Sequence, residues 1–343
     1  MKKQKLFFAP DLLTGRLTEE DTKKYFSRFG WFAFATFMIY MVTVSILSTI
    51  IYEVAPDVYY HHLFLNLSSV IPLYCVALPL GYLVLRPLPS VTPKSSSADG
   101  KTKFGFKGGF FSICICLTLM MLGSYISQIF MTFFQILRQD IIENPLEEVL
   151  NNTPIWSVIL FTVILAPILE EVLFRGIVCK KLLALGEGYA IVASAVLFAV
   201  FHGNFYQLFY AFTLGCFFAF IYVKTGKLRY TILLHMLVNF FGGAIPTMLL
   251  SKLDLNLLME GNIDYVVANI GAILLFLLYE LLYYGGAIAG IVIIATQFRK
   301  FKIQKTGLLP PPEKRGVRCA IFNAGIITAA ALFALNLLGS LAL

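Results

Sequence analysis

Hydrophobic residues in this chain are gathered into long runs that recur from residue 31 to residue 342. A helix needs about 20 mostly apolar residues to cross a bilayer. The fifth run is short, which predicts a partial or tilted span, and the eighth is long enough to tilt or to extend beyond the bilayer. We therefore predict an all-α, polytopic membrane protein with about 8–9 transmembrane helices. The candidate spans are roughly 31–52, 63–85, 110–137, 155–179, 189–202, 205–223, 230–250, 265–297 and 319–342.

Composition supports this interpretation. The 343 residues are 59% hydrophobic and 13% charged, with a mean hydropathy of +0.81, whereas a soluble domain carries about 25% charged residues. The net charge of +8 is interpreted as orientation charge rather than as a nucleic-acid footprint, because the basic residues lie in loops on one side of the membrane. The first 30 residues are polar and mixed in charge, so no secretory signal peptide is expected.

Loop charges predict the orientation. Lys and Arg follow the second, fourth, sixth and eighth runs, while the loops at 53–62 and 138–154 are mainly acidic. Basic loops stay in the cytoplasm, so the N-terminus is expected to be cytoplasmic, and nine spans would place the C-terminus outside. We predict a cytoplasmic N-terminal arm at 1–30, helices 1–3 within 31–150 with a flexible linker at 88–108, core helices at 151–250, and C-terminal helices at 251–343 with a Pro-rich basic connector at 300–318.

Several polar side chains interrupt the apolar runs of the core helices. A charged residue at membrane depth costs roughly 2.5–3.5 kcal/mol on insertion scales, so each such residue is a functional-site hypothesis. These residues are Glu170 and Glu171, Arg175 one turn later, His202 four residues after Phe198, and His235 four residues before Asn239. Residues four apart share a helix face, so Glu171 and Arg175 can neutralise each other and leave Glu170 free for chemistry.

The chemistry of these groups allows two kinds of hydrolytic site. A carboxylate in a low-dielectric cavity can act as a general base for water, while imidazole and carboxamide groups stabilise an oxyanion. Alternatively, Glu171, His202 and His235 are a candidate ligand set for catalytic zinc, with the second glutamate as base. No HExxH helix is present, so the usual zinc-protease motif is missing. A relay in a proton- or ion-coupled transporter is a further alternative, which the lack of an internal repeat disfavours.

These residues carry a resemblance to a known family. Residues 170–175, EEVLFR, resemble the EExxxR motif of the CPBP family of CAAX prenyl proteases and bacteriocin-processing enzymes, also called the Abi family. Phe198 and His202 match its FxxxH motif, and His235 and Asn239 match its HxxxN motif. The stretch HGNFYQLFYAFTLGCFFAFIYVKTGKL between them resembles the bacterial branch. The resemblance covers about 155–243.

The resemblance implies an intramembrane endopeptidase whose catalytic core is 151–250 and whose site opens toward the cytoplasm. It implies that Glu170 activates water, that His202 orients it, that His235 and Asn239 stabilise the oxyanion, and that Glu171 with Arg175 supports the site. No cofactor is certain. Zinc stays a candidate, and we favour a glutamate-activated water because no independent zinc signature exists. The expected partners are the lipid bilayer and a peptide or membrane-protein substrate, with no nucleic acid. A non-proteolytic membrane scaffold or bacteriocin self-immunity protein is the alternative.

Overall fold

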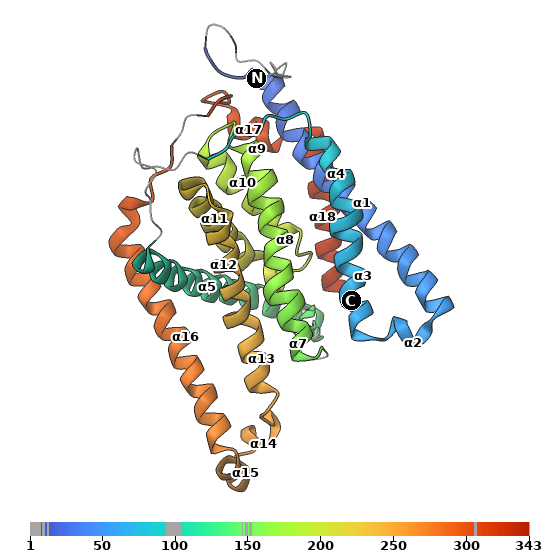
Figure 1. The fold of residues 1–343 in the computed structure, drawn as a ribbon, viewed down its shortest axis with the longest axis vertical. Coiled ribbons are helices and arrows are strands. Elements are labelled where there is room, and N and C mark those ends of the chain that lie inside the picture. The colour runs from blue at the N-terminus through green and yellow to red at the C-terminus, as the bar shows by residue number, and fades with distance from the viewer. Residues whose placement is uncertain are drawn as a thin grey trace. The chain divides into compact units, whose positions relative to one another are not determined.

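A computed structural model describes residues 8, 11, 14–93, 105–145, 147, 150, 153–304 and 307–342. Throughout these residues the regular structure is helical, and the described part of the chain contains no strand (Figure 1). Seven helices are long and apolar enough to cross a membrane, and the apolar helices at Glu187–Val200 and Ala324–Gly339 are shorter. The two short helices correspond to the fifth and ninth predicted spans. The prediction of an all-α polytopic membrane protein is confirmed.

The chain divides into two compact units, which are described separately. Unit 1 comprises Met1–Pro93, Leu173–Asn204 and Ile303–Leu343, and unit 2 comprises Lys94–Val172 and Phe205–Lys302. The division falls inside the long helix Ile155–Leu182. The first sequence motif therefore contributes its glutamates to unit 2 and its arginine to unit 1.

Unit 1 is built around the long N-terminal helix α1. Two glycines, Gly30 of α1 and Gly325 of α18, let these helices approach until a Cβ on either would collide with backbone of the other, and Figure 1 shows α18 running beside α1. The helices of this unit are α1 (Glu19–Val54), α2 (Pro56–Tyr59), α3 (His62–Ile71), α4 (Leu78–Leu85), α9 (Lys180–Leu182), α10 (Glu187–Val200), α17 (Gly316–Ile321) and α18 (Ala324–Ala342).

The predicted N-terminal arm is helical from Glu19 onward. Helix α1 begins at Glu19 instead of residue 31, and residues 1–7, 9–10 and 12–13 of the arm lie outside the described residues. The Thr18 hydroxyl caps the helix by accepting from the Asp21 backbone N–H at 3.1 Å, and the acidic first turn suits the positive end of the helix dipole. Tyr25 and Phe29 are then fully covered, so this basic segment is part of the packed unit.

The two predicted connectors make specific contacts where they are described. The Lys181 ammonium donates to the Leu88 carbonyl at 2.9 Å, and the Val91 N–H donates to the Lys180 carbonyl at 2.9 Å. The start of the predicted flexible linker is therefore bound to α9, while residues 94–104 lie outside the described residues. In the Pro-rich connector, the Leu309 N–H donates to the Ala184 carbonyl at 2.7 Å.

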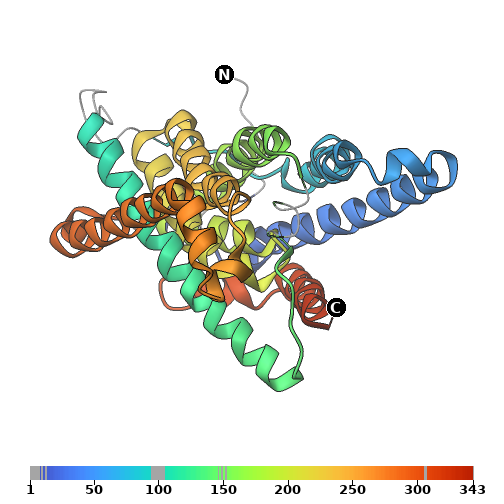
Figure 2. The same ribbon diagram turned by 90° about the horizontal axis from the view of Figure 1, so that it is seen from below.

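Unit 2 centres on α5, which lies along α11 and crosses α16 (Figure 2). Gly286 and Gly290 of α16 lie directly on α5, where a Cβ on Gly290 would collide with the Cys114 carbonyl. Small residues four positions apart let two membrane helices approach closely in this way. The helices of this unit are α5 (Phe106–Arg138), α7 (Ile155–Ser157), α11 (Phe205–Thr225), α12 (Leu228–Asn239), α13 (Ile245–Leu250), α14 (Leu255–Met259), α15 (Ile263–Ala268) and α16 (Ile270–Gln297).

Wider π-helical turns interrupt the helices that carry the candidate site. The helix α8 (Ala166–Leu173), which carries both glutamates, lies between π-helical segments at Val158–Leu165 and Phe174–Cys179. Another π-helical segment, Phe240–Ala244, begins immediately after Asn239. Such turns leave backbone carbonyls outside the regular hydrogen-bond ladder and occur frequently at functional sites.

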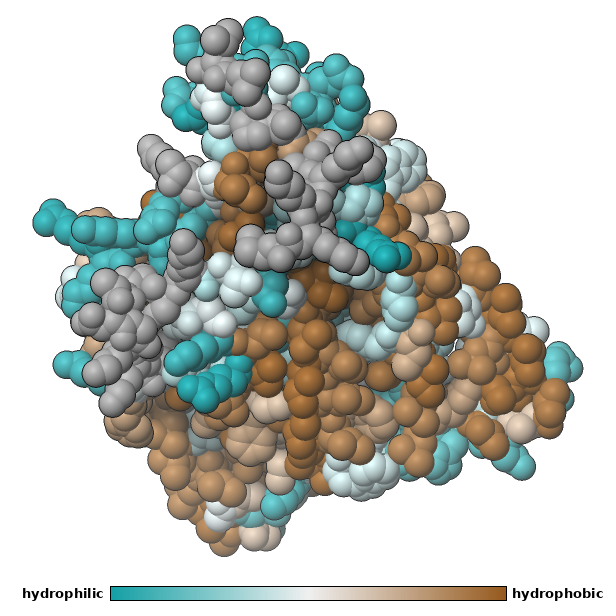
Figure 3. Space-filling model, turned by 45° about the horizontal axis from the view of Figure 1, so that its top comes forward, coloured by the Kyte–Doolittle hydropathy of each residue, from teal (hydrophilic) through white to brown (hydrophobic). Residues whose placement is uncertain are grey.

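The exterior of the helices is apolar. Hydrophobic residues (brown) cover much of the lower part of the face drawn in Figure 3. Along α16, Leu274, Leu278 and Leu281 are more than half exposed. Exposed apolar helix surfaces of this kind suit contact with lipid tails rather than with water.

Candidate active site

Three ionisable side chains meet in unit 2. His235 of α12 points one ring nitrogen at each of the two glutamates of α8. Its Nδ1 lies 3.1 Å from Glu171 Oε1, a hydrogen-bond distance, and its Nε2 lies 3.7 Å from Glu170 Oε2. A carboxylate oxygen can only accept, so a bond between His235 and ionised Glu171 requires the proton on Nδ1. Nε2 is then the nitrogen that faces Glu170.

The two glutamates differ in accessibility. The Glu171 side chain is fully buried and that of His235 is 6% exposed, whereas that of Glu170 is 21% exposed. Within the described residues, Glu170 Oε2 makes no hydrogen bond. Glu171 is thus a buried anchor for the imidazole, and Glu170 is the more exposed of the two side chains, although its Oε2 is itself buried.

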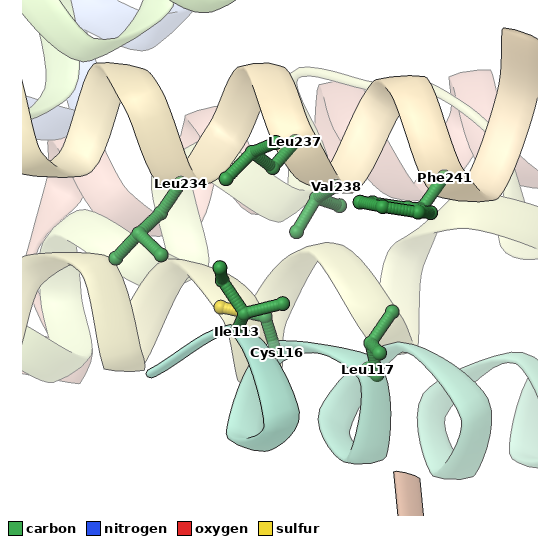
Figure 4. Close-up of a pocket in the computed structure, with 7 residues that line it drawn as sticks. All are labelled: Ile113, Cys116, Leu117, Leu234, Leu237, Val238 and Phe241. Atoms are coloured by element: carbon green, nitrogen blue, oxygen red, sulfur yellow. The ribbon is translucent and has the colours of Figure 1, made fainter. Parts of the chain in front are cut away.

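Core packing explains why His235 faces α8. Leu234 and Val238, on either side of His235 along α12, are buried in a cluster with α5 and α11, and the His235 ring lies 5.3 Å from that of Phe218. Figure 4 shows Leu234, Leu237, Val238 and Phe241 above Ile113, Cys116 and Leu117 of α5, around a small apolar recess. These contacts fix the rotation of α12 about its axis and therefore the direction of the imidazole.

Asn239 joins α12 to the helix that carries the glutamates. Its side-chain Nδ2 donates to the Thr162 carbonyl at 2.8 Å, and Thr162 lies in the π-helical segment Val158–Leu165. A carboxamide nitrogen carries two hydrogens, so this bond leaves Asn239 with a second donor. The two polar residues of the HxxxN motif therefore contact one continuous stretch of chain: His235 contacts Glu171 of α8, and Asn239 contacts Thr162 in the π-helical segment before α8.

The remaining motif residues meet on Phe198 in unit 1. The Arg175 guanidinium is fully buried and lies 4.7 Å from the centroid of the Phe198 ring. The His202 ring contacts the same phenyl group edge-on, with centroids 4.9 Å apart and planes at 79°. Phe198 is 2% exposed, so the phenylalanine of the FxxxH motif packs between the arginine and the histidine.

The surroundings of His202 define its tautomer. Its Nδ1 lies 2.9 Å from the Phe198 carbonyl, and a carbonyl cannot donate, so Nδ1 carries the proton and Nε2 is left for other chemistry. The next residue, Gly203, has φ +70°, a conformation that favours glycine. Asn336 of α18 donates to the Gly203 carbonyl at 3.2 Å and holds this turn in place.

The structure thus brings together Glu170, Glu171 and His235 in unit 2, where Asn239 binds the segment that precedes the glutamates. It brings together Arg175 and His202 on Phe198 in unit 1. The expected Glu171–Arg175 ion pair and the approach of His202 to Glu170 would join the two units, and both stay predictions. In the described part of the chain, no three His, Cys, Asp or Glu side chains are grouped to hold a metal ion. Two of the zinc candidates, Glu171 and His235, hydrogen-bond to each other, and the complete zinc set also stays a prediction.

Comparison with known proteins supports the same stretch. Residues 152–241, which contain all six candidate residues, match the family described as type II CAAX prenyl endopeptidase Rce1-like. This match supports the resemblance of the stretch to the CPBP family. The chain is 36% identical over 90 residues to the membrane-embedded CAAX protease MroQ of Staphylococcus aureus (strain USA300). The alignment covers 24% of this chain and 36% of that protein. No solved structure matches the chain.

Several residues that shape the candidate site could not be predicted from the sequence. Thr162 contributes only its backbone carbonyl, Phe218 contributes a ring face, and Asn336 lies more than a hundred residues from the turn that it holds. No sequence pattern identifies such partners, because each acts through a contact between helices. The sequence identifies Phe198 only as part of the FxxxH motif. The structure shows that Arg175 and His202 both pack on its ring.

Proposed function

We propose that this chain is a membrane-embedded endopeptidase in which Glu170 activates the attacking water. The observation that carries the proposal is the position of His235 between two adjacent intramembrane glutamates, in a segment of the CPBP family. Glu171 is hydrogen-bonded to Nδ1 of the imidazole, and the more exposed Glu170 lies near Nε2. This arrangement suits a general base whose proton can be shared with a neighbouring group.

The proposed reaction follows from these positions. Water attacks the carbonyl carbon of the peptide bond, and Glu170 takes the water proton. The carbon–nitrogen bond then breaks, and Glu170 returns the proton to the leaving amine. His235, hydrogen-bonded to the Glu171 carboxylate, can carry positive charge, and with the second N–H of Asn239 it would stabilise the oxyanion.

Unit 1 would supply the supporting groups. We assign His202 Nε2 to orienting the water and Arg175 to holding the Glu171 side of the site. Zinc on Glu171, His202 and His235 would supply a Lewis acid in their place, and we favour the metal-free reaction because Glu171 already engages His235 Nδ1. Loop charge favours a cytoplasmic N-terminus and a site open to the cytoplasm, and the proposed substrate is a peptide or a membrane protein.

The test compares peptide and protein termini in the native host. Three strains would carry the wild type, Glu170→Gln, or Glu280→Gln at matched expression. Glu280 is a suitable control because it is also a partly buried carboxylate in a predicted span of unit 2. We expect new termini in the wild type and in the Glu280→Gln strain, and none in the Glu170→Gln strain.

Termini that persist in the Glu170→Gln strain would refute the role of Glu170 as base. Identical termini in all three strains and in a deletion strain would refute proteolysis itself. If a host phenotype were then rescued equally by all three proteins, the scaffold or self-immunity alternative would replace the protease.

A further inference from the structure

Five cations gather at the ends of two helices of unit 2, away from the glutamates. We name them the basic cluster: Lys227 and Arg229 at the start of α12, and Arg299, Lys300 and Lys302 after the end of α16. All five are exposed. Over the residues that the structure describes, none of them makes an ion pair with a carboxylate.

Aromatic contacts hold the two parts of the basic cluster side by side. The rings of Phe220, near the end of α11, and Phe301 lie 5.3 Å apart. Phe220, Tyr230 and Phe301 all pack against the same buried core between α5, α11 and α12. Because α11 ends at Thr225 and α12 begins at Leu228, the contact of Phe301 with Phe220 brings the segment after α16 close to the beginning of α12.

Two cations of the basic cluster, and Lys224 beside it, lie over aromatic rings. Arg229 and Lys227 lie 5.1 Å and 5.7 Å from the centroid of the Tyr230 ring, and Lys224 lies 5.8 Å from that of Phe220. No Asp or Glu occurs in residues 205–253 or 298–302. The cations of both segments thus have no acidic residue near them in the sequence. They lie where apolar helices begin or end.

We propose that the basic cluster binds the phosphate headgroups of anionic phospholipids. Lys and Arg supply the charge that phosphate requires, and an aromatic ring at the end of an apolar helix belongs at the level of the headgroups. Basic groups between the ends of membrane helices are a recognised way to bind such lipids. A lipid fits better than a soluble polyanion because the cations adjoin the apolar exterior, where acyl chains can lie along α16. The inference is independent of the proposed protease activity.

The experiment uses the purified full-length chain in a neutral detergent. It is titrated with dioctanoyl phosphatidylglycerol, with dioctanoyl phosphatidylcholine, or with inorganic phosphate, and binding is followed by the midpoint of thermal unfolding. The test variant replaces Lys227, Arg229 and Lys300 by Gln. A matched control replaces Arg86, Lys314 and Arg318 of unit 1, which are also exposed, by Gln. A second variant, Lys227→Arg, Arg229→Lys and Lys300→Arg, keeps the charge.

We expect the wild type to prefer phosphatidylglycerol, and the test variant to bind it about 100-fold more weakly, at about fivefold per cation. The control and the charge-conserving variant should stay within about threefold of the wild type. Equal binding of both lipids by the wild type would overturn the proposal. An equal loss of phosphatidylglycerol binding in the control would show general charge attraction and would also overturn the proposal. Stabilisation by inorganic phosphate as large as that by the lipid would show an anion site instead of a lipid site.

Discussion

The two adjacent glutamates are expected to respond differently to the same substitution. We predict that Glu171→Gln lowers the free energy of unfolding by about 1–2 kcal/mol. Glu170→Gln should change it by less than about 0.5 kcal/mol. Processing activity should show the opposite order, with the larger loss for Glu170→Gln. Stability and activity would then separate two residues that are neighbours in sequence and identical in chemistry.

The magnitude follows from the two distances to His235. Glu171 Oε1 accepts from Nδ1 at 3.1 Å, with the carboxylate fully buried. A hydrogen bond to a charged group contributes about 1.5–3 kcal/mol and a neutral one about 0.5–1.5 kcal/mol. The Gln carbonyl can still accept, so the loss is the difference between the two. Glu170 is 3.7 Å from Nε2 and 21% exposed, so it has no direct hydrogen bond to lose.

The assay is thermal unfolding of the purified variants in one detergent, extended to a double-mutant cycle with His235→Asn. The cycle should give a coupling energy of at least about 1 kcal/mol for Glu171 with His235 and a smaller one for Glu170 with His235. Equal destabilisation by the two glutamine variants would refute the reasoning. A coupling near zero for Glu171 would show that the 3.1 Å contact does not stabilise the fold.

Three further predictions concern the surrounding groups. Asn239→Ala should lower the free energy of unfolding by about 1–3 kcal/mol because it leaves the Thr162 carbonyl without this donor. Thr162→Val keeps the backbone carbonyl and should leave the Asn239 bond intact. Thermal unfolding of the two variants compares these effects. Phe198→Leu should lower stability by about 0.5–2 kcal/mol through loss of the Arg175 contact, and an unchanged melting temperature would contradict that contact. Processing activity should survive dialysis against a strong zinc chelator, and a loss that added zinc restores would contradict the metal-free reaction at Glu170.

The sequence alone was enough for the class of fold and the approximate positions of the helices. Long apolar runs are a local property, and the bilayer selects them whatever their neighbours are. The start of α1 was misplaced because Lys23, Lys24 and Arg28 resembled a solvated arm, while the Thr18 cap and the packing of Tyr25 favour helix from Glu19. The motif residues were also identified from sequence, because polar groups stand out in apolar helices.

The contacts of those residues required the tertiary structure. Spacing placed His235 and Asn239 on one face of α12, and only packing of Leu234 and Val238 against α5 and α11 decided that this face meets α8. The same packing set Asn239 on the Thr162 carbonyl. The sequence determined which residues carry charge into the membrane, because the hydropathy of a residue depends on its own side chain and not on its neighbours in space. Only the rotation and register of packed helices decided which charges meet, because these depend on side chains far apart in the chain.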